Sequence, residues 1–73
     1  MNNSKRRVAL GNAIRERREG QGISQRKLAQ MIGSGSHSYL VEIENGTKSV
    51  GFDKLCAIAD ALDVNVGYFF TRV

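Results

Sequence analysis

The sequence predicts an all-α fold, a compact bundle of about five short helices. Apolar residues recur at three- and four-residue steps through most of the 73-residue chain, which is the period of an amphipathic helix. No segment alternates convincingly at the two-residue period that a half-buried strand requires. The chain has eight glycines and no proline, and the glycines separate the helical segments.

The first predicted helix spans about residues 8–19. Leu10, Ala13 and Ile14 share one of its faces and form its core side. Gly20 is expected to end this helix, because glycine readily adopts the left-handed conformation found at helix C-termini.

The second and third predicted helices each follow a serine. Ser24 precedes a helix over about 25–32, and Gly33 follows that helix. Ser36 is the expected cap of a third helix over about 37–44. Serine is favoured at such positions because its hydroxyl accepts a hydrogen bond from a first-turn amide.

Asn45 and Gly46 are expected to end the third helix, because both residues tolerate a positive φ. Two more predicted helices complete the core. A fourth helix is predicted over about 52–62, and a short fifth helix over about 66–70 covers the core. The expected core face of the fourth helix carries Phe52, Leu55, Cys56, Ala59 and Leu62.

The length of the chain allows one domain. We divide it into a basic N-terminal arm over 1–7, a helical domain over 8–70 and a short tail over 71–73. Apolar runs are only a few residues long, so no membrane span is predicted. The basic start is followed by too short an apolar run for a signal peptide, so a cytoplasmic location is expected.

The residue inventory argues against catalysis and metal binding. Cys56 is the only cysteine and His37 the only histidine, so no cluster has the spacing of metal ligands. Ser36, His37 and Ser38 are not a catalytic arrangement, because successive helical residues point about 100° apart. We therefore predict that the chain is not an enzyme and has no metal, cofactor or small-molecule ligand.

The positive charge lies in the first part of the chain. The net charge is +4, made up of +6 over residues 1–27 and −2 over residues 28–73. This asymmetry is typical of a protein with one side facing a polyanion. A solvated basic surface explains it equally well, so charge alone does not decide.

Two short helices joined by a glycine-containing turn, in a small basic domain, suggest a helix-turn-helix. The second helix of such a pair enters the major groove, so its outer face should be small and polar. The residues that fit that face are Ser36, His37, Ser38 and Glu42, and Val41 could contact a thymine methyl.

The chain resembles the phage-repressor and Cro type of helix-turn-helix, often called XRE-like, over about residues 10–70. The resemblance implies a lambda-repressor-like DNA-binding domain whose helix-turn-helix comprises the second and third helices. It also implies a sequence-specific transcriptional regulator, acting as a repressor by operator occupancy. The residues that carry it are Ile14, Arg15, Glu16, Arg18, Gly22–Gln25, Leu28, Ala29, Ile32, Gly33, Tyr39–Gly46, Leu55, Ile58–Val64, Phe69 and Phe70.

The resemblance implies a role for each matching position. His37, Ser38 and Glu42 match base-reading positions, to which the residue pattern adds Val41. Arg18 and Glu44 match an ion pair between the first helix and the end of the recognition helix. The expected phosphate contacts are Gln25, Ser36, Tyr39, Asn45, Thr47 and Lys48.

Three features depart from the family pattern. Ser34 and Gly35 stand where the family usually has one apolar residue, so a looser turn is expected. Arg17 falls where the family usually has an inward-facing leucine, so either its stem packs against the core or the helix is rotated. The predicted recognition helix contains no lysine or arginine, which supply the commonest guanine contact.

Other functions remain open at this point. The uncharged recognition helix and the altered turn also suit a helix-turn-helix used mainly for protein interaction. RNA binding or nucleolysis is a further alternative, disfavoured by the missing catalytic pairs and aromatic platforms. Phage repressor, restriction-modification controller, antitoxin and host regulator all share such a domain.

The expected partner is double-stranded DNA with a two-fold symmetric operator. A single module of this kind buries little surface on DNA, so a homodimer is expected. The aromatic C-terminal region is the predicted dimer contact, and Tyr68 or Phe70 is expected to take part in it.

Overall fold

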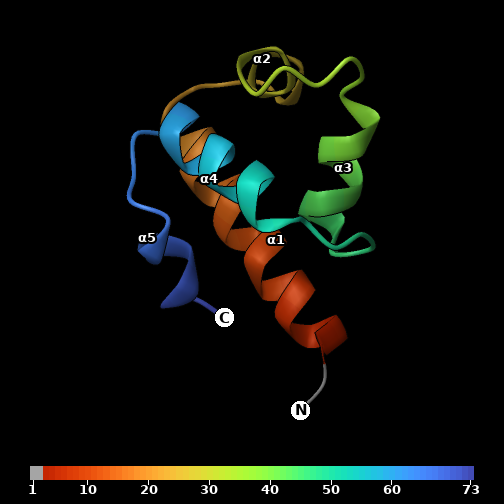
Figure 1. The fold of residues 1–73 in the computed structure, drawn as a ribbon, viewed down its shortest axis with the longest axis vertical. Helices are drawn as coiled ribbons and strands as arrows, with labels where there is room; N and C mark the ends of the chain where they lie inside the picture. Colours follow the sequence, from red (N-terminus) through yellow and green to blue (C-terminus); the bar gives the residue numbers. More distant parts are fainter. Residues whose placement is uncertain (1–2) are drawn as a thin grey trace.

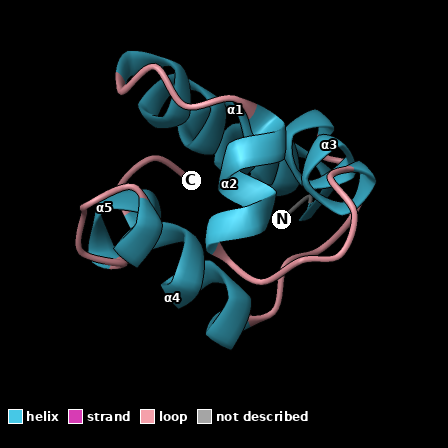
Figure 2. Ribbon diagram, turned by 90° about the horizontal axis from the view of Figure 1, so that it is seen from above, coloured by secondary structure: helices cyan, strands magenta, loops and turns pink. Residues whose placement is uncertain are grey.

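The computed structural model describes residues 3–73 and contains five helices and no strand over that range. The helices are α1 (Asn3–Gly20), α2 (Gln25–Met31), α3 (Ser38–Asn45), α4 (Phe52–Ala61) and α5 (Gly67–Phe70). In Figure 1, α1 runs through the molecule with α3 on one side and α5 on the other. Viewed from above in Figure 2, α2 lies in the foreground and contacts both α3 and α4. The predicted all-α architecture of five short helices is confirmed.

Two predicted helix starts were wrong. Helix α1 begins at Asn3 rather than at Val8, so the described part of the predicted basic arm is helical; residues 1–2 of that arm lie outside the described residues. Straight-chain basic residues such as Lys5 have good helix propensity, and no breaker precedes Val8. Helix α3 begins at Ser38, one residue later than expected, because the first helical hydrogen bond runs from Val41 N–H to the carbonyl of His37.

The predicted caps follow their expected chemistry at two places. The Ser24 hydroxyl accepts a hydrogen bond from the Lys27 amide at 3.0 Å and starts α2. Gly46 ends α3 in the left-handed conformation with φ 76°. The predicted cap Ser36 lies one residue before the observed cap, His37, but its hydroxyl still accepts from the Ser38 amide at 3.2 Å.

The core forms from one face of each helix. Phe69 of α5 is fully buried and packs edge-on against Tyr68, so the short fifth helix covers the core as expected. The buried apolar residues are Ala13, Ile14, Leu28, Ala29, Ile32, Leu40, Ile43, Leu55, Ile58, Ala59, Leu62 and Phe69.

Two residues predicted for the core of α4 lie outside it. Phe52 is 63% exposed, because it is the first residue of α4 and projects beyond the turn where Leu55 begins the packing. Cys56 is only half-buried. The apolar period of α4 was therefore correct, but its inward face is narrower than the sequence indicated.

Close contact between α1 and α3 depends on two glycines. A Cβ atom on Gly11 would lie 2.4 Å from the carbonyl oxygen of Ile43 and 2.6 Å from that of Glu44. A Cβ atom on Gly46 would lie 2.7 Å from the Cα of Val8. The end of α3 can therefore lie directly on the α1 backbone, which fixes the position of α3 on the domain.

Arg17 explains one departure from the family pattern. Its Nε donates to the carbonyl oxygen of Leu62 at 3.0 Å, and its Nη2 donates to that of Asp63 at 3.4 Å. These carbonyls follow the end of α4, where helix carbonyls have no partner within the helix. Arg17 therefore holds α4 against α1 by capping it, in place of an apolar contact.

Candidate nucleic-acid interface

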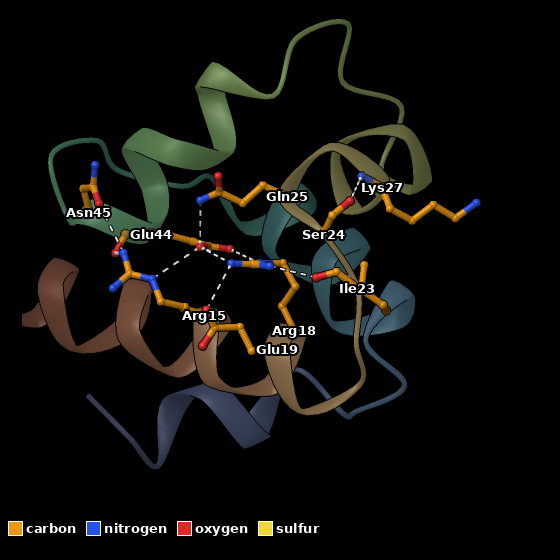
Figure 3. Close-up of polar contacts among 9 residues, drawn as sticks. All are labelled: Arg15, Arg18, Glu19, Ile23, Ser24, Gln25, Lys27, Glu44 and Asn45. Carbon is orange, nitrogen blue, oxygen red and sulfur yellow. Dashed lines mark hydrogen bonds and ion pairs between the residues drawn. The ribbon is translucent and has the colours of Figure 1, made fainter.

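A buried ion pair joins α1 to the end of α3. Arg18 Nε donates to Glu44 Oε2 at 2.6 Å, and Arg18 Nη2 donates to Glu44 Oε1 at 3.0 Å. The two residues are only 8% and 1% exposed. Arg18 Nη1 also donates to the carbonyl of Ile23 at 2.7 Å. This is the pair that the family resemblance implied, in the bidentate geometry that makes such pairs directional (Figure 3).

Glu44 is the centre of a larger network. Gln25 Nε2 of α2 donates to Glu44 Oε1 at 3.0 Å, and Arg15 Nε of α1 lies 3.5 Å from the same oxygen. One carboxylate therefore connects all three helices around the candidate interface (Figure 3). Its hydrogen bond to the Arg18 guanidinium raises the pKa of that group, because the bond and the nearby negative charge favour the cation.

Arg15 belongs to this network, although sequence reasoning gave it no site role. Its Nη2 donates to the backbone carbonyl of Glu44 at 3.2 Å and to Oδ1 of Asn45 at 3.1 Å. Arg15 lies three residues before Arg18, a spacing that places both on one helix face. That spacing was the available signal. Because Asn45 Oδ1 accepts from Arg15, its amide nitrogen is the group left to donate outward.

The predicted base-reading residues form one stripe on the outer side of α3. Ser38 and Glu42 are exposed and lie one helical turn apart, and Val41 beside them is half-buried. His37 is half-buried and lies at the cap rather than inside the helix. The inward face of the same helix carries Leu40, Ile43 and Glu44.

The loop after α3 folds back onto the stripe. The backbone amide and the hydroxyl of Thr47 donate to the carbonyl of Glu42 at 3.0 and 3.2 Å. Lys48 Nζ lies 3.9 Å from Glu42 Oε1 and 5.6 Å from the centre of the Tyr39 ring. The loop therefore places a cation next to the one carboxylate exposed on this helix.

Serine hydrogen bonds order the turn between α2 and α3. The Ser34 amide donates to the carbonyl of Ala29 at 2.8 Å, and the Ser34 hydroxyl donates to the carbonyl of Ser36 at 2.8 Å. The Ser36 and Ser38 hydroxyls lie 2.6 Å apart. Local hydrogen bonds of serine side chains therefore stand where the family usually has an apolar residue.

Within residues 3–73, no group of three or more His, Cys, Asp or Glu side chains could hold a metal ion. None of the described helices is long and apolar enough to cross a membrane.

Comparison with known proteins establishes the class. A family model described as helix-turn-helix matches residues 14–69, and the chain therefore belongs to this helix-turn-helix family. The curated HTH-type transcriptional regulator y4aM of Sinorhizobium fredii is 38% identical over 63 residues. That match covers 86% of this chain and 43% of the relative, so the chain spans less than half the relative's length.

Solved structures confirm the fold. The clp gene regulator ClgR from Corynebacterium glutamicum matches with a TM-score of 0.87 and 34% identity, over 92% of this chain and 70% of ClgR. The restriction-modification controller protein C.AhdI from Aeromonas hydrophila matches with a TM-score of 0.84 and 33% identity, over 88% of this chain and 96% of C.AhdI. Both similarities extend over nearly the whole chain.

Proposed function

We propose that this chain binds double-stranded DNA sequence-specifically and regulates transcription, with α3 in the major groove. The observation that carries the proposal is the exposed stripe of α3, whose opposite face is fixed to α1 and α2 through Glu44. A helix held at a fixed angle can present its outer side chains to base edges. Family membership and the regulatory names of y4aM, ClgR and C.AhdI support this function.

The proposed base readers are those of the stripe and its cap. Glu42 can accept a hydrogen bond from a cytosine amino group, Val41 can contact a thymine methyl, and Ser38 can bond to several base edges. His37, the fourth reader predicted from the sequence, lies at the cap of α3 and is half-buried. Lys48, 3.9 Å from Glu42, lowers the repulsion between that carboxylate and the DNA phosphates.

The proposed phosphate contacts lie on both sides of α3. Each of Gln25 and Asn45 has one part of its amide engaged within the protein and an N–H left to donate. Lys48 supplies a flexible cation, and Tyr39 and Ser36 supply hydroxyls. The Thr47 hydroxyl already donates to the Glu42 carbonyl, so we propose that Thr47 mainly positions Lys48.

We further propose a homodimer through the C-terminal region, acting as a repressor by operator occupancy. Phe70 and Val73 are 52% and 48% exposed and lie beside an apolar hollow that Leu10 also lines. The Tyr68 ring is covered by the Arg72 guanidinium at 3.5 Å, which leaves Phe70 as the more available aromatic. Dimers of this class bind half-sites about 34 Å apart.

Direct binding assays test the proposed function. Fluorescence anisotropy with duplex DNA, single-stranded DNA and RNA should show preference for the duplex. Duplex affinity should fall steeply between about 50 and 200 mM salt, because phosphate contacts release counterions. No duplex binding at low salt would contradict the proposal and favour the protein-interaction alternative.

A further inference from the structure

A polar pocket lies between α2 and the turn that precedes α3. Its volume is about 300 Å³, and Arg26 and Gln30 of α2 face Ser36 and His37 across it. The pocket adjoins the N-terminal end of the α3 stripe, since Ser36 and His37 directly precede Ser38. Residues 34–37, which also line the pocket, belong to the loop between α2 and α3 that Figure 1 shows.

The pocket presents hydrogen-bond donors and positive charge. Within the described part of the chain, the side chains of Arg26, Gln30 and His37 have no hydrogen-bond or ion-pair partner. The backbone amides of residues 35–37 also have no acceptor among the described residues. The residues that line the pocket include no aspartate or glutamate. This set of groups is complementary to an oxyanion.

Two carbonyls beside the pocket already accept hydrogen bonds. The Ser34 hydroxyl donates to the carbonyl of Ser36, and the His37 carbonyl receives the first helical bond of α3. The carbonyls of Ser36 and His37 are therefore satisfied within the protein, while the amides of residues 35–37 have no acceptor among the described residues. Ser34 and Gly35 stand where the family usually has one residue, so the turn is one residue longer. Both residues line the pocket.

We propose that this pocket binds one phosphate group of the DNA backbone through the Arg26 guanidinium, the His37 imidazole and the turn amides. This proposal rests on the proposed DNA binding and adds a site to it. His37 then has a phosphate partner rather than a base edge, and readout of bases falls to Ser38, Val41 and Glu42. A fixed phosphate beside the first turn of α3 sets the register of those readers on the duplex.

The test compares Arg26→Gln with Lys27→Gln. Both substitutions remove one positive charge from α2, but Lys27 does not line the pocket. Both residues are exposed, and their side chains form no bonds within the described residues, so both variants should melt like the parent. Arg26→Gln should weaken duplex binding about tenfold, which corresponds to about 1.4 kcal/mol of binding free energy. It should also lower the slope of log affinity against log salt by about one.

The decisive readout uses duplexes with a single neutral methylphosphonate at each backbone position in turn. Wild-type protein and Lys27→Gln should lose affinity at one position where Arg26→Gln loses distinctly less, because only the His37 imidazole and the turn amides still contact that phosphate. If Arg26→Gln loses as much affinity as the wild type at every position, the proposal is overturned. If the wild type binds no duplex at all, the proposed function itself fails, which is a separate outcome.

A titration with inorganic phosphate distinguishes the duplex from a free anion. Amide resonances of Gly35, Ser36 and His37 should move on addition of the duplex and only weakly with millimolar inorganic phosphate. The pocket would instead bind a free phosphate if inorganic phosphate alone caused saturable shifts that Arg26→Gln abolished. In that case no methylphosphonate position would affect the wild type more than Arg26→Gln. That result would overturn the duplex assignment.

Discussion

Removing the Glu44 carboxylate should destabilise the domain more than any exposed charge change. Glu44→Ala removes the acceptor of two Arg18 bonds and one Gln25 bond. It leaves the nearly buried Arg18 with only the exposed carboxylate of Glu19, 3.9 Å away, as a charge partner. Breaking one side of a buried pair costs about 3–5 kcal/mol. Small domains have only about 5–15 kcal/mol in total, so the loss is large. Thermal and urea unfolding of the variant measure it.

Glu42→Ala is the matched control, because Glu42 lies on the same helix with its side chain 50% exposed and 3.9 Å from Lys48. Such an exposed pair contributes less than about 1 kcal/mol. The double variant Arg18→Met with Glu44→Leu should recover much of the stability through apolar packing. Recovery should be incomplete, since Arg15 and Gln25 also lose the Glu44 carboxylate as a partner.

A stabilising role of the buried pair is refuted if Glu44→Ala changes the unfolding free energy by no more than Glu42→Ala does. It is also refuted if Arg18→Met leaves the melting temperature unchanged while abolishing DNA binding, because Arg18 would then act at the DNA. A double-mutant cycle over Arg18 and Glu44 measures their coupling directly.

Three further predictions concern the interface and the packing. Lys48→Ala should weaken binding to specific and random duplexes alike, and the slope of log affinity against log salt concentration should fall in magnitude by about one. An unchanged slope would show that Lys48 does not contact a phosphate. Gly11→Ala should lower stability by about 1–3 kcal/mol because its Cβ meets two carbonyls of α3, whereas Gly20→Ala, with open space around it, should not. Phe70→Ser should shift sedimentation toward monomer at matched concentration; a wild-type protein already monomeric would contradict the dimer.

Most of the fold could be predicted because local signals agreed with the global packing. The caps at Ser24 and Gly46 and the apolar period of α4 each indicated an element at the correct place. The predicted start of α1 at about Val8 was too late, because the basic segment before it has no apolar period. No N-cap residue separates that segment from Val8, and the helix includes it. The exposure of Phe52 was missed because a periodic pattern does not reveal where the neighbouring helix begins to pack.

The candidate site was less predictable than the fold. The pairing of Arg18 with Glu44 was implied by family resemblance, because residues 26 positions apart leave no periodic signal. The role of Arg15 and the capping by Arg17 depend on the angle between helices, which only the assembled structure provides. The pocket beside Arg26 likewise results from the path of one turn, and its donors include backbone amides that no residue type reveals.

Selection of bound duplexes from a random library, run with the wild type and with Glu42→Gln, tests the central claim most directly. The claim is that the exposed stripe of α3 reads bases in the major groove. The wild type should select a two-fold symmetric motif, and Glu42→Gln should select the same motif with altered preference at one base position per half-site. The claim is contradicted if the wild type enriches no motif. It is also contradicted if both proteins select the same motif with the same base preference at every position.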